Sequence, residues 1–384
     1  MAEFTKEDLR EFQAEPLPNK IQRTLAKVSE WFSYWEGEVY VSFSGGKDST
    51  VLADICARWC KIIGKTLYLV FVNTGLEYPE IQKHVKFFAE WLREKYGITV
   101  ELEILRPEMA FPEVLKNYGY PIISKHVANK VRLARANIEE GVYSLRLRQL
   151  GIAKDEYGGL RDAGKWDYDA TAEGSKFETP KYRALLPMDI LISEECCNVM
   201  KKDPLKKYEK ETGRYPIVGT IAEESATREA AWLKNGCNAF EAKRKTSQPL
   251  SFWTNQDILL YIKEQELPIP SVYGTIVYAN EPEQIRWGEI DPDFAELESK
   301  EQQRLTTTGC DRTGCIFCAF GCHLEKEPSR FQRLKETHPR QYAYCIGGGE
   351  YDENGIWKPN KDGLGMGHVF DELNKIYGEG FIKY

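Results

Sequence analysis

The sequence predicts an α/β fold with a doubly wound, mostly parallel sheet. Three observations support this prediction. Short apolar segments alternate with segments of helical periodicity, a glycine-containing loop follows the first apolar segment, and Thr66–Val72 is apolar almost throughout. A strand without polar alternation is typical of a parallel sheet that is covered on both faces. With 384 residues, the chain is long enough for such a domain and a sizeable further region.

The first predicted elements follow each other in a regular order. Apolar residues on one helical face predict a helix over Asn19–Trp35, and Glu38–Phe43 is a short strand rich in β-branched and aromatic residues. Helical spacing returns from Val51 to Trp59. After the strand Thr66–Val72, Pro79 begins another helix that reaches Leu92. This part of the chain therefore reads as helix, strand, loop, helix, strand and helix.

The later elements are predicted on the same grounds. Ile98–Leu105 is a third strand, Tyr215–Ile221 a late strand and Ala226–Lys234 a helix. Thr254 and Asp257 have the spacing of an N-terminal cap for a further helix through Ile262. We therefore expect a helical lead-in over residues 1–37, a nucleotide-binding α/β domain over 38–280 and a cysteine-rich C-terminal region over 281–384. Residues from about 109 to 187 show no clean period and are expected to form an insertion.

Composition narrows the classes of partner. The chain has 52 basic and 59 acidic residues, a net charge of −7, which argues against a uniformly basic nucleic-acid coat. The polar start lacks the apolar core of a secretory signal, and no run of about 18 apolar residues occurs, so we expect a cytoplasmic protein with no membrane partner. Ten cysteines in a reducing compartment indicate metal or redox chemistry.

The loop after the first strand has the features of a phosphate site. At the start of a helix, backbone N–H groups lack intrahelical partners and the helix dipole favours an anion. The two glycines allow phosphate oxygens to approach the backbone closely, lysine adds a charge, and the serines add hydroxyl donors. The predicted phosphate-binding residues of this loop are Ser42, Ser44, Gly45, Gly46, Lys47, Asp48 and Ser49.

This loop is not a Walker A loop, because the four-residue spacer between Gly and Gly-Lys is missing. The segment Ser44–Ser49 instead resembles the Ser-Gly-Gly-Lys-Asp-Ser signature of the PP-loop ATP pyrophosphatases. These enzymes have the adenine nucleotide α-hydrolase-like fold. The resemblance implies that the protein binds ATP with Mg²⁺ and releases pyrophosphate, with Lys47 and Asp48 taking part in the reaction.

Two further segments resemble the phosphoadenylylsulfate (PAPS) reductase family. Phe71–Glu80 is similar to the family's Asp-Thr-Gly-x-x-(Phe/Tyr)-Pro-Glu segment, although Asn73 replaces the usual Asp. Gly219–Arg228 is similar to Gly-x-Arg-x-x-(Glu/Gln)-Ser-x-x-Arg, with Ile221 in place of the first Arg. The resemblance implies further nucleotide-binding residues at Asn73, Thr74, Gly75, Glu77, Gly219 and Glu223, and a catalytic role for Arg228.

The chemistry of the charged residues in these segments suggests roles for them. Glu77 and Glu223 are candidates to hold Mg²⁺ on the phosphates, and Arg228 is a candidate to neutralise the charge that builds on departing pyrophosphate. The alternative for each residue is an ordinary solvated charge at a helix end.

The cysteines suggest a second site. The adjacent pair Cys196–Cys197 and the distant Cys315-x-x-Cys318 resemble the arrangement that holds a [4Fe-4S] cluster in adenylylsulfate reductases, and Cys196–Leu205 matches the first half well. We therefore expect Cys196, Cys197, Cys315 and Cys318 to be metal ligands. Because Cys310 and Cys322 flank the second pair, a local zinc site is the alternative.

Basic residues form three islands on this acidic chain. Such islands can attract an anionic substrate, either a sulfonucleotide or a nucleic-acid backbone, but solvated helix faces have the same appearance. The first island contains Lys125, Lys130, Arg132, Arg135, Arg146 and Arg148, the second Lys201, Lys202, Lys206 and Lys207, and the third Lys243, Arg244 and Lys245.

The resemblances lead to one functional expectation with two alternatives. We expect ATP-dependent sulfur transfer to an acceptor, favouring a nucleic acid, with a cysteine desulfurase or another protein as the sulfur donor. The first alternative is a PAPS or adenylylsulfate reductase that releases sulfite. It is disfavoured because Lys47 and Asp48 suit ATP and because the reductases' C-terminal Glu-Cys-Gly-Leu-His is absent from this sequence. The second alternative is a nucleotide-binding subunit without turnover.

Overall fold

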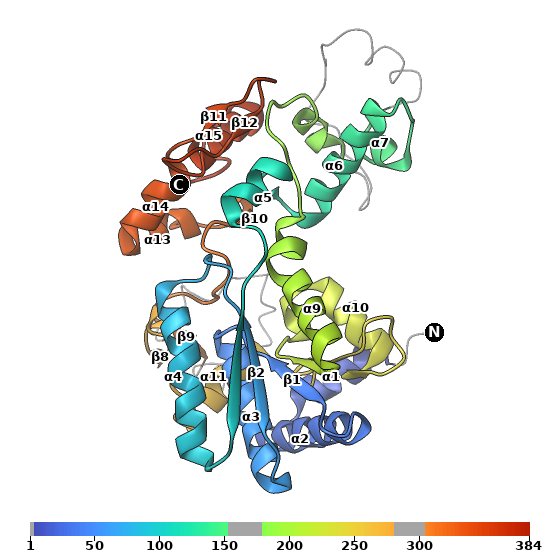
Figure 1. The fold of residues 1–384 in the computed structure, drawn as a ribbon, viewed down its shortest axis with the longest axis vertical. Helices are drawn as coiled ribbons and strands as arrows, with labels where there is room; N and C mark the ends of the chain where they lie inside the picture. The colour runs from blue at the N-terminus through green and yellow to red at the C-terminus, as the bar shows by residue number, and fades with distance from the viewer. Residues whose placement is uncertain (1–3, 153–178, 280–303) are drawn as a thin grey trace, which may run out of the picture. The chain divides into compact units, whose positions relative to one another are not determined.

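The computed structural model describes residues 4–152, 179–279 and 304–384 (Figure 1). They group into two compact units, each built from segments that are distant in the sequence. The first unit comprises Met1–Asn73, Glu77–Arg106 and Leu205–Gly314, and the second Thr74–Leu76, Pro107–Pro204 and Cys315–Tyr384. The predicted three-part division of the chain stays a prediction. Residues 153–178 of the predicted insertion and the boundary at 280/281 lie outside the described residues.

The first unit contains the predicted sheet, in the strand order β3-β2-β1-β5-β7-β6. Neighbouring strands are parallel throughout, except that β6 runs antiparallel to β7. The mostly parallel sheet with flanking helices is therefore confirmed. Its strands are β1 (Val39–Ser42), β2 (Leu67–Val72), β3 (Val100–Leu105), β5 (Tyr215–Val218), β6 (Asn238–Ala239) and β7 (Thr246–Ser247).

The predicted helices of this unit agree closely with the observed ones, and α1 and α9 are additional. Proline begins α4, glycine ends it in the left-handed conformation, and a Thr254–Asp257 capping box begins α11 as expected. The helices are α1 (Lys6–Ala14), α2 (Leu17–Tyr34), α3 (Lys47–Ile63), α4 (Pro79–Tyr96), α9 (Asp203–Thr212, whose first turn belongs to the second unit), α10 (Ala226–Asn235) and α11 (Asn255–Glu264). Shorter elements are the 3₁₀ turns η3 (Ala222–Glu224) and η4 (Ser271–Tyr273), and the β8 (Ile276–Tyr278) and β9 (Leu305–Thr307) hairpin.

Side chains on the two faces of the sheet enter different cores, because successive residues of a strand point in opposite directions. Val39 and Val41 of β1 belong to the main core, together with buried residues of α2, α3, α4 and α11. Tyr40, between them, packs on the other face against Val70 and against Tyr208 of α9. This double coverage explains why β2 reads as a continuous apolar run.

The second unit is mostly helical, with short strands. It contains regular helices within the range that showed no clean period in the sequence, α5 (Phe111–Asn117), α6 (Lys125–Glu139) and α7 (Leu145–Gln149). The parallel pair β4 (Ile122–Ile123) and β10 (Ala319–Phe320) joins its two main segments. The remaining elements are η1 (Pro180–Leu185), η2 (Asn198–Lys202), η7 (Cys322–Leu324), α13 (Arg330–Thr337), α14 (Pro339–Ile346), β11 (Glu350–Tyr351), β12 (Trp357–Lys358) and α15 (Met366–Tyr377).

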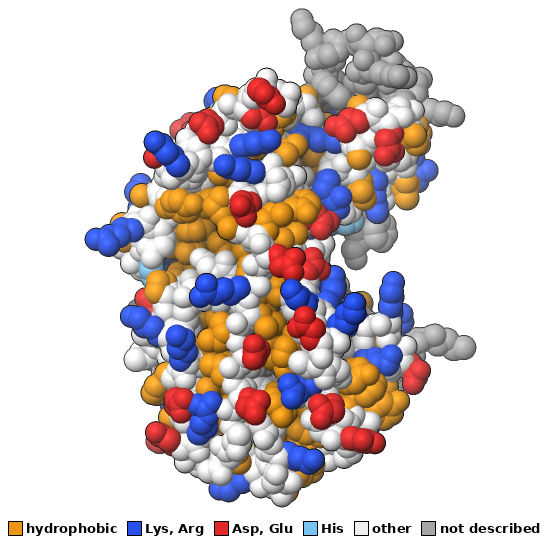
Figure 2. All heavy atoms as spheres, in the orientation of Figure 1, with side chains coloured by type: hydrophobic (Ala, Val, Ile, Leu, Met, Phe, Trp, Pro, Cys, Tyr) orange, Lys and Arg blue, Asp and Glu red, His pale blue; other side chains and the backbone are white. Residues whose placement is uncertain are grey.

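Charges of both signs are interspersed on the face that Figure 2 shows, as expected for an acidic chain with local basic islands. In the parts of the chain that the structure describes, no helix combines the length and the apolar character needed to cross a membrane.

Candidate nucleotide and cysteine sites

The predicted phosphate loop lies between the end of β1 at Ser42 and the start of α3 at Lys47. Gly46 is the N-cap of α3 and has no side chain to occupy the free amides of the first turn. The Ser49 hydroxyl donates to the Gly46 carbonyl at 2.9 Å and lies 3.0 Å from the Ser44 hydroxyl. The loop therefore has the strand, turn and helix geometry that the sequence predicted.

Gly45 shows why this turn needs glycine. Its φ is +74°, and a Cβ atom there would lie 2.8 Å from Val85 Cγ2 and 2.9 Å from Ile81 Cγ2 of α4. Both the backbone conformation and the close packing of α4 therefore exclude a side chain. The packing of α4 holds the loop against the main core.

Lys47 is the basic residue of the loop, and its side chain is only 3% exposed. Its Nζ lies 3.0 Å from Asp48 Oδ1 and 3.2 Å from Oδ2. A buried ammonium needs such a partner, because desolvation of an unpaired charge is costly. The structure thus joins the two predicted loop residues in one ion pair.

The third predicted segment, Gly219–Arg228, lies beside this loop. A Cβ atom on Gly219 would be 3.0 Å from the Asp48 carbonyl oxygen, which shows how closely the segment approaches the first turn of α3. Burial lowers the pKa of Arg228, the Arg312 guanidinium lowers it further, and the Asp48 carboxylate opposes this change. Arg228 therefore lies within electrostatic range of the loop.

The glutamates of this segment have different surroundings. Glu223 is exposed and accepts a 2.7 Å hydrogen bond from the Asn255 amide at the start of α11. Glu224, which the sequence reasoning did not single out, forms ion pairs with Arg228 and, at 2.6 Å, with Arg312. Glu224 is thus the carboxylate that contacts the arginines near the loop.

The structure distributes the second predicted segment between the two units. Asn73 and Glu77 belong to the first unit, whereas Thr74 and Gly75 group with the second. Glu77 is buried, and the Thr74 hydroxyl accepts a 3.1 Å hydrogen bond from the Leu76 amide. The nucleotide-binding roles predicted for this segment stay predictions.

Three residues near the loop were missed by the sequence reasoning. Tyr273, at the end of η4, accepts a 3.2 Å hydrogen bond from the Lys47 amide, and its hydroxyl lies 2.7 Å from the Thr313 hydroxyl. Arg312 precedes Thr313 in the segment that had been assigned only to the cysteine-rich region. A functional residue outside any motif cannot be recognised from the sequence. The isolated glycines Gly274 and Gly309 were the only local sign of tight turns in these segments.

The four cysteines predicted as metal ligands all lie in the second unit. Cys197 directly precedes the π-helical turn η2, a feature that is frequent at functional sites. Cys315 and Cys318 form a turn in which the Cys318 amide donates to the Cys315 carbonyl at 3.1 Å. The Cys196 thiol interacts electrostatically with those of Cys197, Cys318 and Cys315, so the distant pairs are brought together.

The thiols of this group ionise unequally. A hydrogen bond from Cys196 lowers the pKa of Cys197, and the charges of Lys125 and Lys201 lower it further. The same hydrogen bond, together with burial, raises the pKa of Cys196. Burial raises the pKa of Cys318 to about 11. Two of the basic islands therefore each contribute a lysine near Cys197.

None of the ten cysteines forms a disulfide. Among the described residues, no three Cys, His, Asp or Glu side chains converge closely enough to hold a metal ion as they stand. Of the flanking cysteines, Cys322 interacts electrostatically with Cys318 in the second unit, whereas Cys310 interacts with Tyr273 in the first. The choice between an iron–sulfur cluster and zinc stays open at this point.

Much of the first basic island is engaged within the protein. The Arg135 guanidinium donates to the carbonyls of Leu185, Leu186, Met188 and Ile190 at 2.6–3.1 Å. Arg132 pairs with Glu194 and Glu195, and the Lys130 side chain is fully buried. These three cations therefore stabilise the second unit, and the interpretation of the whole island as an anion-attracting surface does not apply to them.

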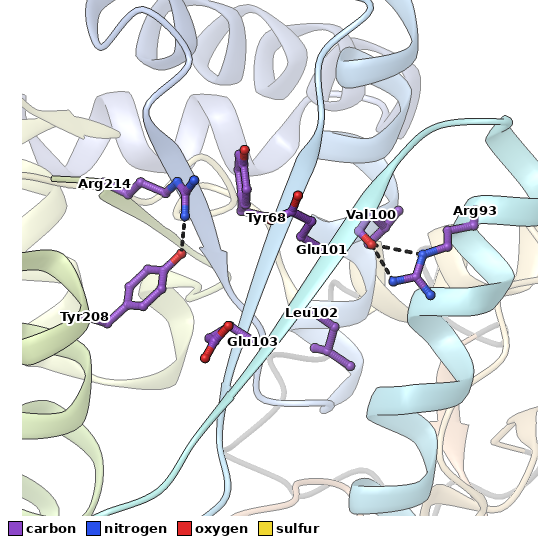
Figure 3. A pocket seen from close by; sticks show the side chains of 8 residues that line it. All are labelled: Tyr68, Arg93, Val100, Glu101, Leu102, Glu103, Tyr208 and Arg214. Carbon is purple, nitrogen blue, oxygen red and sulfur yellow. Dashed lines mark hydrogen bonds between the residues drawn. The ribbon is translucent and has the colours of Figure 1, made fainter. Parts of the chain in front are cut away.

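A cavity of about 260 Å³ lies elsewhere in the first unit, along β2 and β3 (Figure 3). The Arg214 guanidinium stacks 3.5 Å above the Tyr68 ring and donates to the Tyr208 hydroxyl at 2.9 Å. The cavity is lined by Tyr68, Arg93, Val100, Glu101, Leu102, Glu103, Tyr208 and Arg214. None of the predicted nucleotide or cysteine residues lines it.

Two proteins with sequence similarity match only short segments. An uncharacterised protein of Methanocaldococcus jannaschii is 42% identical over 83 residues, which are 22% of this chain and 15% of that protein. The adenosine 5′-phosphosulfate reductase of Deinococcus radiodurans is 29% identical over 91 residues, 23% of this chain and 34% of the reductase. The chain thus matches far less than two thirds of the length of either relative.

Two solved structures show a distant likeness. NMN synthetase from Francisella tularensis has a TM-score of 0.30 at 12% identity, covering 66% of this chain and 72% of that one. The U34-tRNA thiolase NcsA from Methanococcus maripaludis, solved with its [4Fe-4S] cluster, has a TM-score of 0.30 at 18% identity, covering 65% and 64%.

A family model spans most of the described sites. The model for the phosphoadenosine phosphosulfate reductase domain matches residues 38–138 and 163–320, more than half of the chain. The match includes the loop before α3, the segment with Arg228 and all four predicted cysteine ligands. The chain therefore belongs to the PAPS reductase family.

Proposed function

We propose that this protein binds ATP at the loop between β1 and α3, releases pyrophosphate and activates an acceptor for sulfur transfer. The observation that carries the proposal is the loop itself. Gly45 and Gly46 place no side chain of their own over the start of α3, and Lys47, Asp48 and Arg228 lie around it in one compact unit. Such an arrangement of amides and cations suits a polyphosphate.

The proposed reaction has two steps. An acceptor oxygen attacks the α-phosphorus of ATP, the bond to the bridging oxygen of the β-phosphate breaks, and pyrophosphate leaves. In the second step a persulfide sulfur from a donor protein attacks the activated carbon of the acceptor, and AMP leaves with the acceptor oxygen. A second thiol of the donor then cleaves the resulting S–S bond, which releases the thiolated acceptor and leaves the donor as a disulfide. In this scheme Lys47 and Arg228 stabilise the negative charge on the leaving pyrophosphate, while Mg²⁺, for which Glu77 and Glu223 are proposed ligands, neutralises the phosphates.

The cysteine site is proposed to hold a [4Fe-4S] cluster through Cys196, Cys197, Cys315 and Cys318. The electrostatic interactions among these thiols, the absence of disulfides and the lysines beside Cys197 fit a set of thiolate ligands. A bound cluster would supply an iron for binding sulfur. Zinc on the same thiolates, or on a set with Cys310 or Cys322, is the alternative.

The acceptor is proposed to be a nucleic acid, with a cysteine desulfurase as the source of sulfur. The cations that support this are the ones not engaged in the second unit's packing, such as exposed Lys202 and Lys243. Lys130, Arg132 and Arg135 take no part in the proposed acceptor surface.

One assay separates the proposal from its alternatives. Purified protein is incubated with ATP and Mg²⁺, with and without bulk tRNA, and pyrophosphate and AMP are measured. Pyrophosphate release that increases with the acceptor supports the proposal. Thioredoxin-dependent sulfite release from a sulfonucleotide, without pyrophosphate from ATP, would show a reductase instead, and tight ATP binding without either product would show a non-catalytic subunit.

A second measurement tests the cluster. Iron, zinc and acid-labile sulfide are determined in anaerobically purified protein. About four irons and four sulfides per chain would support a [4Fe-4S] cluster, as this cluster type requires. Zinc without sulfide would contradict it.

A further inference from the structure

A segment from far down the chain reaches the phosphate loop within the first unit. The hairpin of β8 and β9 leads into Gly309 and Cys310, whose amides donate to the carbonyls of Tyr273 and Val272 at 2.9 and 3.0 Å. Gly309 is required there, because a Cβ atom would lie 2.3 Å from the Val272 carbonyl oxygen. These contacts fix the course of the chain up to Thr313.

Two hydroxyl groups connect this segment to the loop. The Thr313 and Tyr273 hydroxyls lie 2.7 Å apart, and the Tyr273 hydroxyl accepts from the Lys47 amide at 3.2 Å. A Cβ atom on Gly46 would lie 3.2 Å from each hydroxyl oxygen. Thr313 is therefore directly beside the glycine that begins α3, and Arg312 precedes it in the chain.

Glu224 connects the same segment to Arg228 of the third predicted segment. Its Oε1 accepts from Arg312 at 2.6 Å, and its Oε2 pairs with Arg228. One carboxylate thus holds two guanidinium groups, and the cluster retains a net positive charge. Two like charges held together in this way interact more favourably with an added anion than either does alone.

We propose that Arg312 is a phosphate-binding residue that acts together with Arg228 on the pyrophosphate end of the nucleotide, and that Glu224 is the positioning residue for both. This inference rests on the proposed ATP site. The Arg312 side chain is 61% exposed, so its guanidinium remains accessible from solvent while Glu224 holds one edge of it. Guanidinium groups bind phosphate oxygens in pairs of hydrogen bonds, which makes arginine suited to this role.

A purely structural role predicts something different. An exposed ion pair contributes little to stability, so removing Arg312 would then change neither nucleotide affinity nor folding appreciably. A phosphate-binding role predicts that removing Arg312 weakens the binding of a ligand more when the ligand carries more phosphates. Comparing ATP, pyrophosphate and AMP therefore separates the two roles.

The test is isothermal titration calorimetry with Mg²⁺ and each of these three ligands. The variants are Arg312→Ala, Arg312→Gln and Arg312→Lys, with Lys47→Ala as a check of the ATP site. Arg10→Ala is the matched control, because Arg10 is an exposed arginine of the same unit that pairs with Glu7. Thermal unfolding shows whether each variant is folded, and Arg312→Gln replaces Arg312→Ala if the latter is not.

We expect Arg312→Ala and Arg312→Gln to weaken ATP and pyrophosphate binding about 10- to 100-fold, the range for a lost hydrogen bond to a charged group. AMP binding should change by less than about twofold, Arg312→Lys should recover part of the loss, and Arg10→Ala should behave as wild type. Wild-type affinity for ATP in Arg312→Ala, or an equal loss for ATP and AMP, would overturn the inference while leaving the ATP site intact. A wild-type protein that binds no ATP, or a Lys47→Ala variant that binds it normally, would overturn the proposed function and the inference with it.

Discussion

The two units of this protein assemble their candidate sites in different ways. In the first unit, consecutive residues from Ser44 to Ser49 form the phosphate loop at one junction between strand and helix. In the second unit, two distant cysteine pairs meet only through folding, and their lysine neighbours come from α6 and η2. The first site depends mainly on backbone amides and the second on side chains. Substitutions should therefore affect the first through turn geometry and charge, and the second through ligand identity.

The largest effect is expected at Lys47. Lys47→Ala removes the positive charge of the loop, which is proposed to stabilise the leaving pyrophosphate, so we expect pyrophosphate release to fall by about 100-fold or more, the range for a lost transition-state stabiliser. A discontinuous or fluorimetric pyrophosphate assay measures this. Lys61→Ala, an exposed lysine on the same helix, is the control. Unchanged turnover in Lys47→Ala would remove this lysine from the reaction.

In the second unit, loss of one cysteine ligand should lower the metal content and leave nucleotide binding unchanged. Cys197→Ala is expected to lower iron and labile sulfide to a small fraction of the wild-type content, because three thiolates hold the cluster weakly. Cys345→Ala removes a fully buried thiol of the same unit and should retain both. Equal iron content in wild type and Cys197→Ala would show that the second site does not depend on the Cys197 side chain.

Arg135 tests whether the first basic island belongs to the fold. Arg135→Met leaves four carbonyl groups without their donor, and we expect the free energy of unfolding to fall by about 3 kcal/mol. Urea denaturation measures the change. Arg148→Met, at an exposed arginine of the same island, should change stability by less than about 0.5 kcal/mol. If the two variants were equally stable, Arg135 would be free to bind an external anion after all.

Gly45→Ala tests how far the loop depends on backbone conformation. A φ of +74° and contacts under 3.0 Å with α4 should cost about 1–3 kcal/mol of stability and distort the loop. Denaturation curves and nucleotide affinity would both report it. Gly64→Ala is a useful comparison, because Gly64 has a φ of +65° but no atom within 4 Å of the added Cβ. A smaller loss for Gly45→Ala than for Gly64→Ala would contradict the packing argument.

A pH dependence centred on His84 is the last prediction. Burial lowers the pKa of His84 from its ordinary 6.5 to about 4, while it contacts the Thr50 hydroxyl at 3.3 Å. Between these values the unfolded chain binds a proton that the folded chain does not. The free energy of unfolding therefore decreases as the pH falls from 6.5 to 4, by at most about 1.4 kcal/mol per pH unit.

The measurement is urea denaturation between pH 7 and pH 4. His84→Gln should flatten this dependence relative to wild type. His323→Gln, at a half-buried histidine of the second unit whose pKa burial also lowers, should flatten it less. Parallel curves for wild type and His84→Gln would rule out His84 as the titrating group.

Much of the first unit could be predicted because its signals are local. Pro79, Gly97 and the Thr254–Asp257 box begin or end helices through short-range contacts, and the predicted strands appear within a few residues of their observed limits. The helix α6 was missed because its apolar residues are interrupted by cations such as Lys130, which the fold buries. The helices α5 and α7 have only 7 and 5 residues, too few to show a helical period. A residue that is charged in the sequence and buried in the structure breaks the pattern on which such predictions depend.

By itself, the sequence determined the strand, turn and helix geometry of the loop, because six consecutive residues set its backbone conformation and place Lys47 and Asp48 beside it. It also predicted Cys196, Cys197, Cys315 and Cys318 as one ligand set, which stays a prediction. Only the tertiary structure decided that Glu224 joins Arg228 to Arg312 and that the Tyr273 hydroxyl accepts from the first amide of α3. It also decided that Lys130, Arg132 and Arg135 of the first basic island are engaged within the protein. The physical reason is that backbone geometry is set by neighbours in the chain, whereas an ion pair or a hydrogen bond between distant segments exists only after the core has packed and brought them within a few ångströms.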